Sequence, residues 1–390
     1  MLKIIIHDYA GHPFQFDLSK TLAKEFKVYH LYYANDYGPK GDFNNIHQNL
    51  VCEGVGKDIL YNKKNFFFRF FKDLQYGYQL AKKIDDIKPD IVISGNCPTF
   101  AQEIIFRKSK KNKSIFILWV QDFYSIAVKK ILQKKLFFIY RPISFVFNFF
   151  EKKQFKLSNH IIVISDHFID QIKNWKISLN KISVIKNWGN LEKINFEKKN
   201  LEFLNMHKLD AKKFHLVYTG TLALKHNPDL IAKLAIHNPE IEILVFGVGS
   251  GIDVLKKMNI PKNVKIYPLQ PFKKLNDILN TADAFLAMIN EDAGEFSVPS
   301  KVLNYLCAGR PILISAPKTN QASKIIDQNN VGRSFDPNDF DGLNKFLAEI
   351  YLNKNKRLEM SKNGRNFAEK NFNIDEIAFK FKKIFHDNIK

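Results

Sequence analysis

The sequence contains few cysteines and no long apolar run. Its three cysteines, Cys52, Cys97 and Cys307, are too few and too scattered for a disulfide framework or a structural zinc site, so we expect a reducing, cytoplasmic setting. No stretch reaches the ~18 uninterrupted apolar residues of a membrane-spanning helix, because Arg141 interrupts the longest one, residues 136–150. The apolar amino-terminal stretch is too short for a signal peptide. These features argue against a disulfide-rich secreted protein and an integral membrane protein.

Acidic residues are scarce relative to basic ones, and the imbalance is local. The chain has 60 Lys and Arg against 39 Asp and Glu, a net charge of +21. Residues 51–200 hold 28 basic and 13 acidic residues, whereas residues 201–350 hold 17 and 16. A compositional drift toward lysine would charge both parts alike. The first half therefore has a charged surface of its own.

Two basic stretches, residues 63–72 and 129–153, interleave lysines with phenylalanines. This pattern is typical of helices that lie in a membrane interface, where an anionic leaflet attracts each lysine by ~1 kcal/mol. A buried helix with a solvated rim is the alternative. No RNP, zinc-finger or helix-turn-helix signature accompanies the charge, so we expect no nucleic-acid partner.

Short apolar runs alternate with amphipathic stretches, which predicts α/β domains with parallel sheets covered on both faces. The pattern lapses between Trp188 and Lys213, so we expect two doubly wound domains with a cleft between them. The basic, helical end of the chain resembles the first half in charge, and we expect it to return there. The predicted parts are a first domain over residues 1–195, a second over 213–370 and a terminal helix over 371–390. The expected strands cover residues 2–6, 27–31, 91–94, 114–120, 160–164, 182–185, 214–218, 242–246, 264–267, 284–288 and 311–315.

One candidate binding loop follows the first predicted strand. Gly11 permits a tight turn, and His12 precedes a helix that Pro13 can open. The free N–H groups of a helix N-terminus suit a phosphate or carboxylate. A plain strand-to-helix turn is the alternative.

Two further loops lie in the second half. Gly220 ends a strand, and Lys225 precedes a helix near Pro228, where a lysine can neutralise a phosphate. The glycine-rich turn with Gly247 and Gly249 lacks the glycine spacing and the acidic residue of a dinucleotide fingerprint, so we expect no dinucleotide cofactor.

The third loop runs into a helix that begins near Pro299 and is stopped by Gly309. Backbone N–H groups at the start of this helix can face a diphosphate. Side chains in its first two turns lie near a phosphate or ribose. The residues concerned are Ser297, Val298, Ser300, Lys301 and Asn304.

The segment Pro299-Ser-Lys-Val-Leu-Asn-Tyr-Leu-Cys-Ala-Gly-Arg-Pro-Ile-Leu resembles the nucleotide-sugar signature of glycosyltransferase family 4. The chain is most similar to the subgroup of N-acetylfucosaminyltransferase type, which builds O-antigen, capsule or exopolysaccharide. The resemblance implies the GT-B fold, with the acceptor in the first domain, the nucleotide sugar in the second and no required metal or other cofactor. Further matching segments follow the same order along the chain: residues 5–15, 119–123, 163–165, 184–188 and 218–220.

The sequence departs from the family at three places. Asn304 stands at the second position of the frequent Glu-x7-Glu pair, and Phe296 at the first, with Glu295 one place away. The frequent His-Asp pair of the first domain is here Gln121-Asp122. The arginine that follows the glycine at position 220 is replaced by Thr221, which leaves Lys225 as the main phosphate cation.

The resemblance implies a retaining hexosyltransferase that moves a sugar, an N-acetylated hexose, from a UDP donor to a polyprenyl-diphosphate-linked saccharide on the inner face of the plasma membrane. Asp122 would orient the acceptor hydroxyl, and Glu295 would contact the donor sugar. A non-hydrolysing sugar-nucleotide epimerase and a non-catalytic membrane-associated scaffold are the alternatives. The expected substrate-binding residues are Gly11, His12, Gln121, Gly220, Lys225, Gly247, Gly249, Phe296, Ser297, Val298, Ser300, Lys301 and Asn304.

Overall fold

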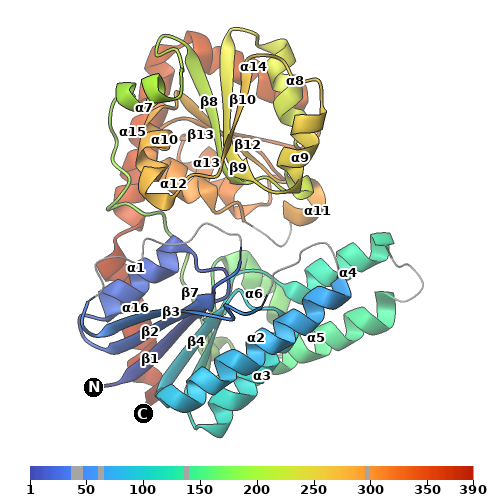
Figure 1. Ribbon diagram of the computed structural model, residues 1–390, viewed down its shortest axis with the longest axis vertical. Coiled ribbons are helices and arrows are strands. Elements are labelled where there is room, and N and C mark those ends of the chain that lie inside the picture. Colours follow the sequence, from blue (N-terminus) through green and yellow to red (C-terminus); the bar gives the residue numbers. More distant parts are fainter. Residues whose placement is uncertain (37–46, 60–65, 136–139, 295–297, 390) are drawn as a thin grey trace. The chain divides into compact units, whose positions relative to one another are not determined.

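The chain folds into two compact units, each built on one parallel sheet with helices on both faces (Figure 1). The computed structural model describes residues 1–36, 47–59, 66–135, 140–294 and 298–389. The first unit comprises residues 1–186 and 374–390, and the second comprises residues 187–373. The sequence predicts a first domain that continues to residue 195, but the chain enters the second unit at Asn187.

Within the described residues, the first unit has a seven-stranded sheet in the order β3-β2-β1-β4-β5-β6-β7. Its strands are β1 (Lys3–Asp8), β2 (Lys27–Tyr33), β3 (Leu50–Val55), β4 (Ile91–Gly95), β5 (Ile115–Val120), β6 (His160–Val163) and β7 (Ile182–Val184). Its helices are α1 (Pro13–Leu22), α2 (Phe66–Ile87), α3 (Thr99–Lys111), α4 (Tyr124–Lys135), α5 (Tyr140–Leu157), α6 (Asp166–Lys173), η1 (Leu179–Lys181) and α16 (Ile374–Ile389).

Strand β5 shows how the first sheet is covered on both faces. Successive side chains of a strand point to opposite faces. Phe116 packs against Phe106 of α3, with ring centroids 5.2 Å apart. Trp119 instead packs against Phe381 of α16 at 5.0 Å and against Phe14 of α1. Because α16 lies beside α1, the end of the chain completes the layer on that second face.

Within the described residues, the second unit has a six-stranded sheet in the order β10-β9-β8-β11-β12-β13. Its strands are β8 (Phe214–Thr221), β9 (Ile241–Val248), β10 (Val264–Pro268), β11 (Ala284–Met288), β12 (Ile312–Ser315) and β13 (Gly332–Phe335). Its helices are α7 (Leu201–Met206), η2 (Leu224–His226), α8 (Asp229–His237), α9 (Ser250–Lys257), η3 (Phe272–Lys274), α10 (Leu275–Asn280), α11 (Glu291–Gly294), α12 (Lys301–Ala308), α13 (Gln321–Gln328), α14 (Phe340–Leu352) and α15 (Lys354–Asn371).

The core of the second unit explains why its strands are almost wholly apolar. Leu216 and Tyr218 of β8 pack with residues of α8, α9 and α14 on one face. On the other face, Tyr305 of α12 stacks on Phe285 of β11 with ring centroids 4.1 Å apart. Strands that are buried on both faces cannot alternate apolar with polar residues, so they form continuous apolar runs.

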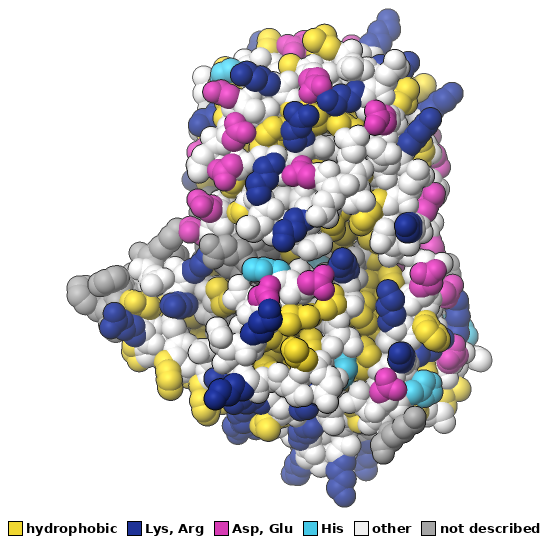
Figure 2. Space-filling model, turned by 180° about the vertical axis from the view of Figure 1, so that it is seen from behind, with side chains coloured by type: hydrophobic (Ala, Val, Ile, Leu, Met, Phe, Trp, Pro, Cys, Tyr) yellow, Lys and Arg dark blue, Asp and Glu magenta, His cyan; other side chains and the backbone are white. Residues whose placement is uncertain are grey.

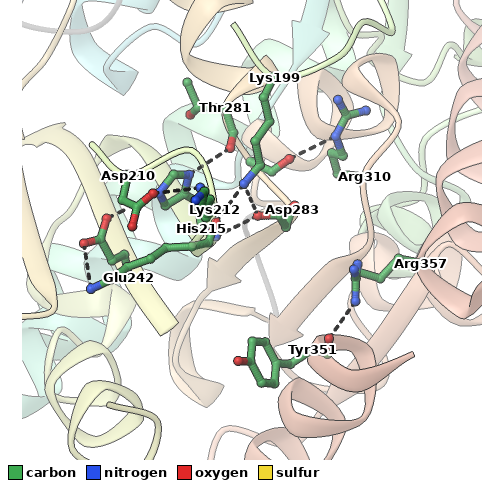
Figure 3. Close-up of polar contacts among 12 residues, drawn as sticks. Lys199, Asp210, Lys212, His215, Glu242, Thr281, Asp283, Arg310, Tyr351 and Arg357 are labelled. Carbon is green, nitrogen blue, oxygen red and sulfur yellow. Dashed lines mark hydrogen bonds and ion pairs between the residues drawn. The ribbon is translucent and has the colours of Figure 1, made fainter. Parts of the chain in front are cut away.

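The amino ends of β8 and β9 hold a cluster of ion pairs (Figure 3). The Glu242 carboxylate is almost completely buried and lies 3.0 Å from Lys265 Nζ, 3.4 Å from Lys213 Nζ and 3.3 Å from His215 Nε2. Burial raises the pKa of Glu242, but the hydrogen bond and charge of Lys265 and the hydrogen bond of Lys213 outweigh burial, so the pKa of Glu242 lies below its ordinary value. This edge of the sheet is therefore held together by paired charges.

We expect Glu242→Gln to destabilise the protein by ~1–3 kcal/mol at pH 7, because two lysines lose their buried partner. A carboxylate with a lowered pKa stabilises the fold above its ordinary pKa, and this contribution disappears as the pH falls through the folded-state pKa. The difference in the free energy of unfolding between the wild type and the variant should therefore shrink below about pH 4. Urea denaturation at pH 7 and below about pH 4 measures this difference. Glu240→Gln, at an exposed neighbouring position, is the matched control. Equal deficits at both pH values would contradict the ionic role.

Candidate functional site

The first polar site lies at the carboxyl end of β1, between β2 and β4. In doubly wound sheets, ligands bind outside the strand ends at such a point, where the strand order reverses. Asp8, the last residue of β1, is buried and accepts hydrogen bonds from the backbone N–H groups of Ala10 and His12. Gly11 adopts a positive φ of 73°, and α1 begins at Pro13 as the sequence predicts. The turn thus places His12 directly before a helix.

Asp8 also fixes the imidazole of His12. The His12 Nδ1 lies 3.1 Å from one carboxylate oxygen of Asp8, and the His12 side chain is 27% exposed. Burial raises the pKa of Asp8, but the charge and hydrogen bonds of His12 outweigh it, so the pKa of Asp8 falls below its ordinary value. An ionised Asp8 can only accept, so the Nδ1 of His12 carries a proton in this pair, and the neutral form of His12 is held in the Nδ1-protonated tautomer.

A chain of buried hydrogen bonds lies beside this pair. His7 Nε2 is 2.8 Å from the Tyr76 hydroxyl, and His7 Nδ1 is 2.7 Å from Ser94 Oγ. Ser94 Oγ in turn donates to Gln102 Oε1 at 3.0 Å. Burial lowers the pKa of His7 to about 3, so this histidine is neutral. The four side chains hold the carboxyl ends of β1 and β4 in one arrangement.

Gln121 and Asp122 follow β5 and line a small cavity of about 30 Å³. That volume has room for one water-sized group. The cavity is also lined by Glu151 of α5, which accepts backbone N–H bonds from Tyr124 and Ser125 and so caps α4. Burial raises the pKa of Glu151 to about 7 against the effect of these hydrogen bonds.

In the second unit, the carboxyl end of β8 lies between β9 and β11 and borders open space. Gly220 has a φ of 93°, and a Cβ added there would meet no described atom within 4 Å. Gly247 and Gly249 differ, because an added Cβ would lie 2.5 Å from the Gly220 carbonyl oxygen and 2.7 Å from that of Leu222. The glycine-rich turn is thus explained by close packing on the backbone after β8, whereas Gly220 faces space that a ligand can occupy.

Two lysines lie at this edge of the second sheet. Lys301 is the first residue of α12, and its Nζ lies 3.4 Å from the centre of the Tyr218 ring and 3.5 Å from the Thr221 carbonyl oxygen. Burial, followed by the charge of Lys225, lowers the pKa of Lys301 well below its ordinary value. Lys225 in η2 is exposed. The sequence favours Lys225 as the main phosphate cation, but the structure places the less solvated amine at Lys301.

Hydrogen bonds hold the turn that carries Lys225. His226 Nδ1 accepts the N–H of Ala223 at 3.0 Å, which puts the ring proton on Nε2. Burial is the main cause that lowers the pKa of His226 to about 3, so the ring is neutral. The Lys225 carbonyl accepts the Asn290 N–H at 2.8 Å, joining this turn to the loop after β11.

Asn304, for which the sequence predicts a ribose contact, has a structural partner in this fold. Its Oδ1 accepts the backbone N–H of Asn190 at 3.1 Å. An added Cβ at Gly189 would lie 2.4 Å from the Leu303 carbonyl oxygen, so residues 187–190 pack tightly on α12. The carbonyl oxygen of Asn304 therefore fixes the start of the second unit.

The remaining predicted residues lie just before α12. Ser300 is exposed at the N-cap and forms no side-chain capping bond, and Val298 is half-buried. Glu295, Phe296 and Ser297 fall outside the described residues. The apolar pattern does not single out Asp8, Tyr218, His226 or Asn290. Asp8 ends β1, Tyr218 lies in the second half of β8, and His226 and Asn290 lie in the segments that follow β8 and β11, so the sequence signal for these four is their place near the carboxyl ends of strands.

A third feature is an exposed aromatic surface on the helices of the first unit. Phe147 and Phe150 of α5 pack on Phe100 of α3, with ring centroids 4.9 and 5.3 Å apart. The other side of α5 has no such cover: Phe145 is 70% and Phe149 is 55% exposed. Figure 2 shows hydrophobic and basic side chains interleaved along the lower left edge, over α4 and α5. We call the exposed set Phe68, Phe71, Phe145 and Phe149 the aromatic surface.

None of the helices in the described ranges is both long and apolar enough to span a membrane.

Comparison with known proteins places the second unit in a family. Residues 200–367 match the family model described as Glycosyl transferases group 1, so the second unit carries a domain of that family. A curated relative, the probable glycosyltransferase WbjE of Pseudomonas aeruginosa, is 21% identical over 270 residues. The match covers 67% of this chain and 66% of WbjE, so the chain spans slightly less than two thirds of that relative.

Solved structures show the same fold over almost the whole chain. Sucrose-phosphate synthase from Thermosynechococcus elongatus superimposes with a TM-score of 0.78 at 13% identity, covering 99% of both chains. Anabaena HepE in complex with UDP-glucose gives a TM-score of 0.72 at 11% identity, covering 99% of this chain and 100% of HepE. The two parallel-sheet units therefore have the GT-B fold, as the sequence resemblance predicts.

Replacing Asp8 by Asn should release the imidazole of His12 from its single tautomer, because the amide can donate as well as accept. Nitrogen-15 NMR of the histidine side chains measures the tautomer directly. We expect a His12 signal protonated on Nδ1 in the wild type and a mixed signal in Asp8→Asn. His237, on α8 in the other unit, should be unchanged in the same spectrum and serves as the control. A His12 tautomer that Asp8→Asn does not alter would contradict the pairing.

Proposed function

We propose that the protein is a glycosyltransferase that transfers a sugar from a UDP-linked donor to a lipid-linked saccharide. The observation that carries this proposal is the group 1 glycosyltransferase domain over residues 200–367, in which two lysines lie beside open space at the end of β8. The complex of Anabaena HepE with UDP-glucose supports a uridine nucleotide as the donor.

The chemistry requires that a diphosphate leave with its negative charge. An oxygen of the acceptor hydroxyl bonds to the anomeric carbon, the bond from that carbon to the diphosphate breaks, and the hydroxyl proton is released. Lys301, Lys225 and the backbone N–H groups at the start of α12 are the positive and donor groups for the leaving diphosphate, without a metal. Resemblance to family 4 favours retention of the anomeric configuration. His12 and Asp122 are the side chains that we assign to the acceptor hydroxyl.

The aromatic surface supports a membrane-bound acceptor. Exposed phenylalanines of α5, together with Lys129 and Lys130 of the adjoining helix α4, match the composition of a surface that binds an anionic interface. A polyprenyl-diphosphate-linked saccharide at the inner face of the plasma membrane is an acceptor that such a surface would approach. Similarity to the probable glycosyltransferase WbjE supports sugar transfer as the reaction. Resemblance to the N-acetylfucosaminyltransferase subgroup favours surface polysaccharide synthesis, with an N-acetylated hexose as the transferred sugar.

The donor is tested first, with a panel of nucleotide sugars. A true donor present at 100 times its Kd should stabilise the protein by ~2.7 kcal/mol, which a thermal melt detects. The same radiolabelled nucleotide sugar, incubated with a membrane extract, should then label the lipid fraction. An epimerised nucleotide would indicate an epimerase instead, and a protein that changes no nucleotide sugar in the panel would contradict the proposed activity.

The aromatic surface is tested by sedimentation with anionic vesicles. We expect Phe145→Ser with Phe149→Ser to reduce partitioning by at least tenfold, because each inserted phenylalanine contributes ~1.5–3 kcal/mol. Phe379→Ser on α16 removes a phenylalanine of similar exposure, 64%, and is the matched control. Lys129→Glu with Lys130→Glu should weaken binding at low salt and have less effect at ~0.5 M salt. Equal binding by all four proteins would contradict a membrane role of this surface.

A further inference from the structure

Lys301 holds its amine in a position that suits a neutral group better than a charged one. The Nζ lies over the face of the Tyr218 ring, and its hydrogen bond to the Thr221 carbonyl oxygen is long, at 3.5 Å. Within the described part of the chain, no carboxylate forms an ion pair with Lys301. An ammonium gains some energy from an aromatic face, but here it loses much of its hydration without an anionic partner.

The titratable groups around Lys301 do not compensate for that loss. From β8, Tyr218 is kept protonated, because burial raises its pKa well above the ordinary value. From η2, Lys225 contributes a second positive charge and His226 a neutral ring. Burial first, and Lys225 second, therefore lower the pKa of Lys301 well below its usual range. A ligand with negative charge would supply the partner that these elements lack.

We propose that Lys301 is a neutral amine in the unliganded protein and takes up one proton from the solvent when the diphosphate of the donor binds at the carboxyl end of β8. The amine nitrogen gains the proton, a buffer acid loses it, and no other covalent bond changes. This inference rests on the proposed function, because it takes a nucleoside diphosphate as the ligand. It separates the roles of the two lysines: Lys225 is charged before the ligand arrives, and Lys301 becomes charged with it.

Proton uptake on binding has a defined consequence for affinity. By linkage, a ligand that binds together with a proton binds more weakly as the pH rises. The Kd for the nucleotide should therefore increase with pH, by up to tenfold per pH unit while Lys301 is neutral in the free protein and charged in the complex. A lysine that is already charged in the free protein would give no such slope.

The test is calorimetry with UDP at pH 8, where its terminal phosphate, with a second pKa near ~6, is fully ionised. Titrations in two buffers with different ionisation enthalpies give the number of protons taken up. We expect a value approaching one for the wild type and for Lys233→Met, an exposed lysine on α8 that serves as the matched control. Lys301→Arg should bind UDP without proton uptake, because a guanidinium is always charged. Lys301→Met should bind more weakly and also without uptake.

The outcomes separate this proposal from the proposed function. UDP binding to the wild type without proton uptake, or uptake that persists in Lys301→Arg, would overturn the neutral amine and leave the nucleotide donor intact. A wild type that does not bind UDP would remove the uridine donor. In that case, NMR of isotope-labelled lysine side chains in the free protein still decides the matter, with the Lys301 signal assigned by its loss in Lys301→Arg. An ammonium signal at pH 8 would overturn the proposal, and an amine signal would support it.

Discussion

Burial of each parallel sheet on both of its faces governs where polar chemistry can occur in this protein. The strands of both units are almost wholly apolar, and helices cover them on either side, so a polar side chain in mid-strand would need a partner inside the core. The carboxyl edges escape this constraint, because loops replace helices there. His7, Asp8 and Ser94 in the first unit, and Thr219 to Thr221 in the second, all lie within two residues of a strand end.

The two edges of the second sheet treat charge in opposite ways. At the amino edge, Glu242 lies between Lys213, Lys265 and His215, so its charge is balanced within the fold. At the carboxyl edge, Lys301 meets an aromatic ring and a carbonyl oxygen. Paired charges stabilise a structure and leave little for a ligand, whereas an amine without an anionic partner gains one when an anion binds. The same residue type therefore has a structural role at one edge, and we propose a binding role for it at the other.

Whether the sequence reveals a strand or a binding glycine depends on how each one is buried and packed in the fold. Ala284–Met288 is recognisable as a strand because it is buried on both faces, and the sequence predicts its bounds correctly. The sequence does not reveal β3 and β13, since both are edge strands with polar residues such as Glu53 and Arg333. Gly247 and Gly249 look like ligand-binding glycines in the sequence, but the tight packing that explains them involves Gly220 and Leu222, residues more than twenty positions away. Long-range packing of this kind leaves no local pattern.

The two lysines show the same limit for the site. Lys225 follows a glycine turn and precedes a helix, so sequence logic selects it first. Lys301 is distinguished only by Tyr218, which is more than eighty residues away and contributes an aromatic face rather than an acid. The pKa of a lysine depends on how far its amine is removed from water, and this burial is set by the folded chain rather than by the local sequence. In the proposed site, the exposed Lys225 would attract an anion from solution, and the charge of Lys301 would depend on the bound anion. A diphosphate site built from both would draw its ligand with the first lysine and hold it with the second.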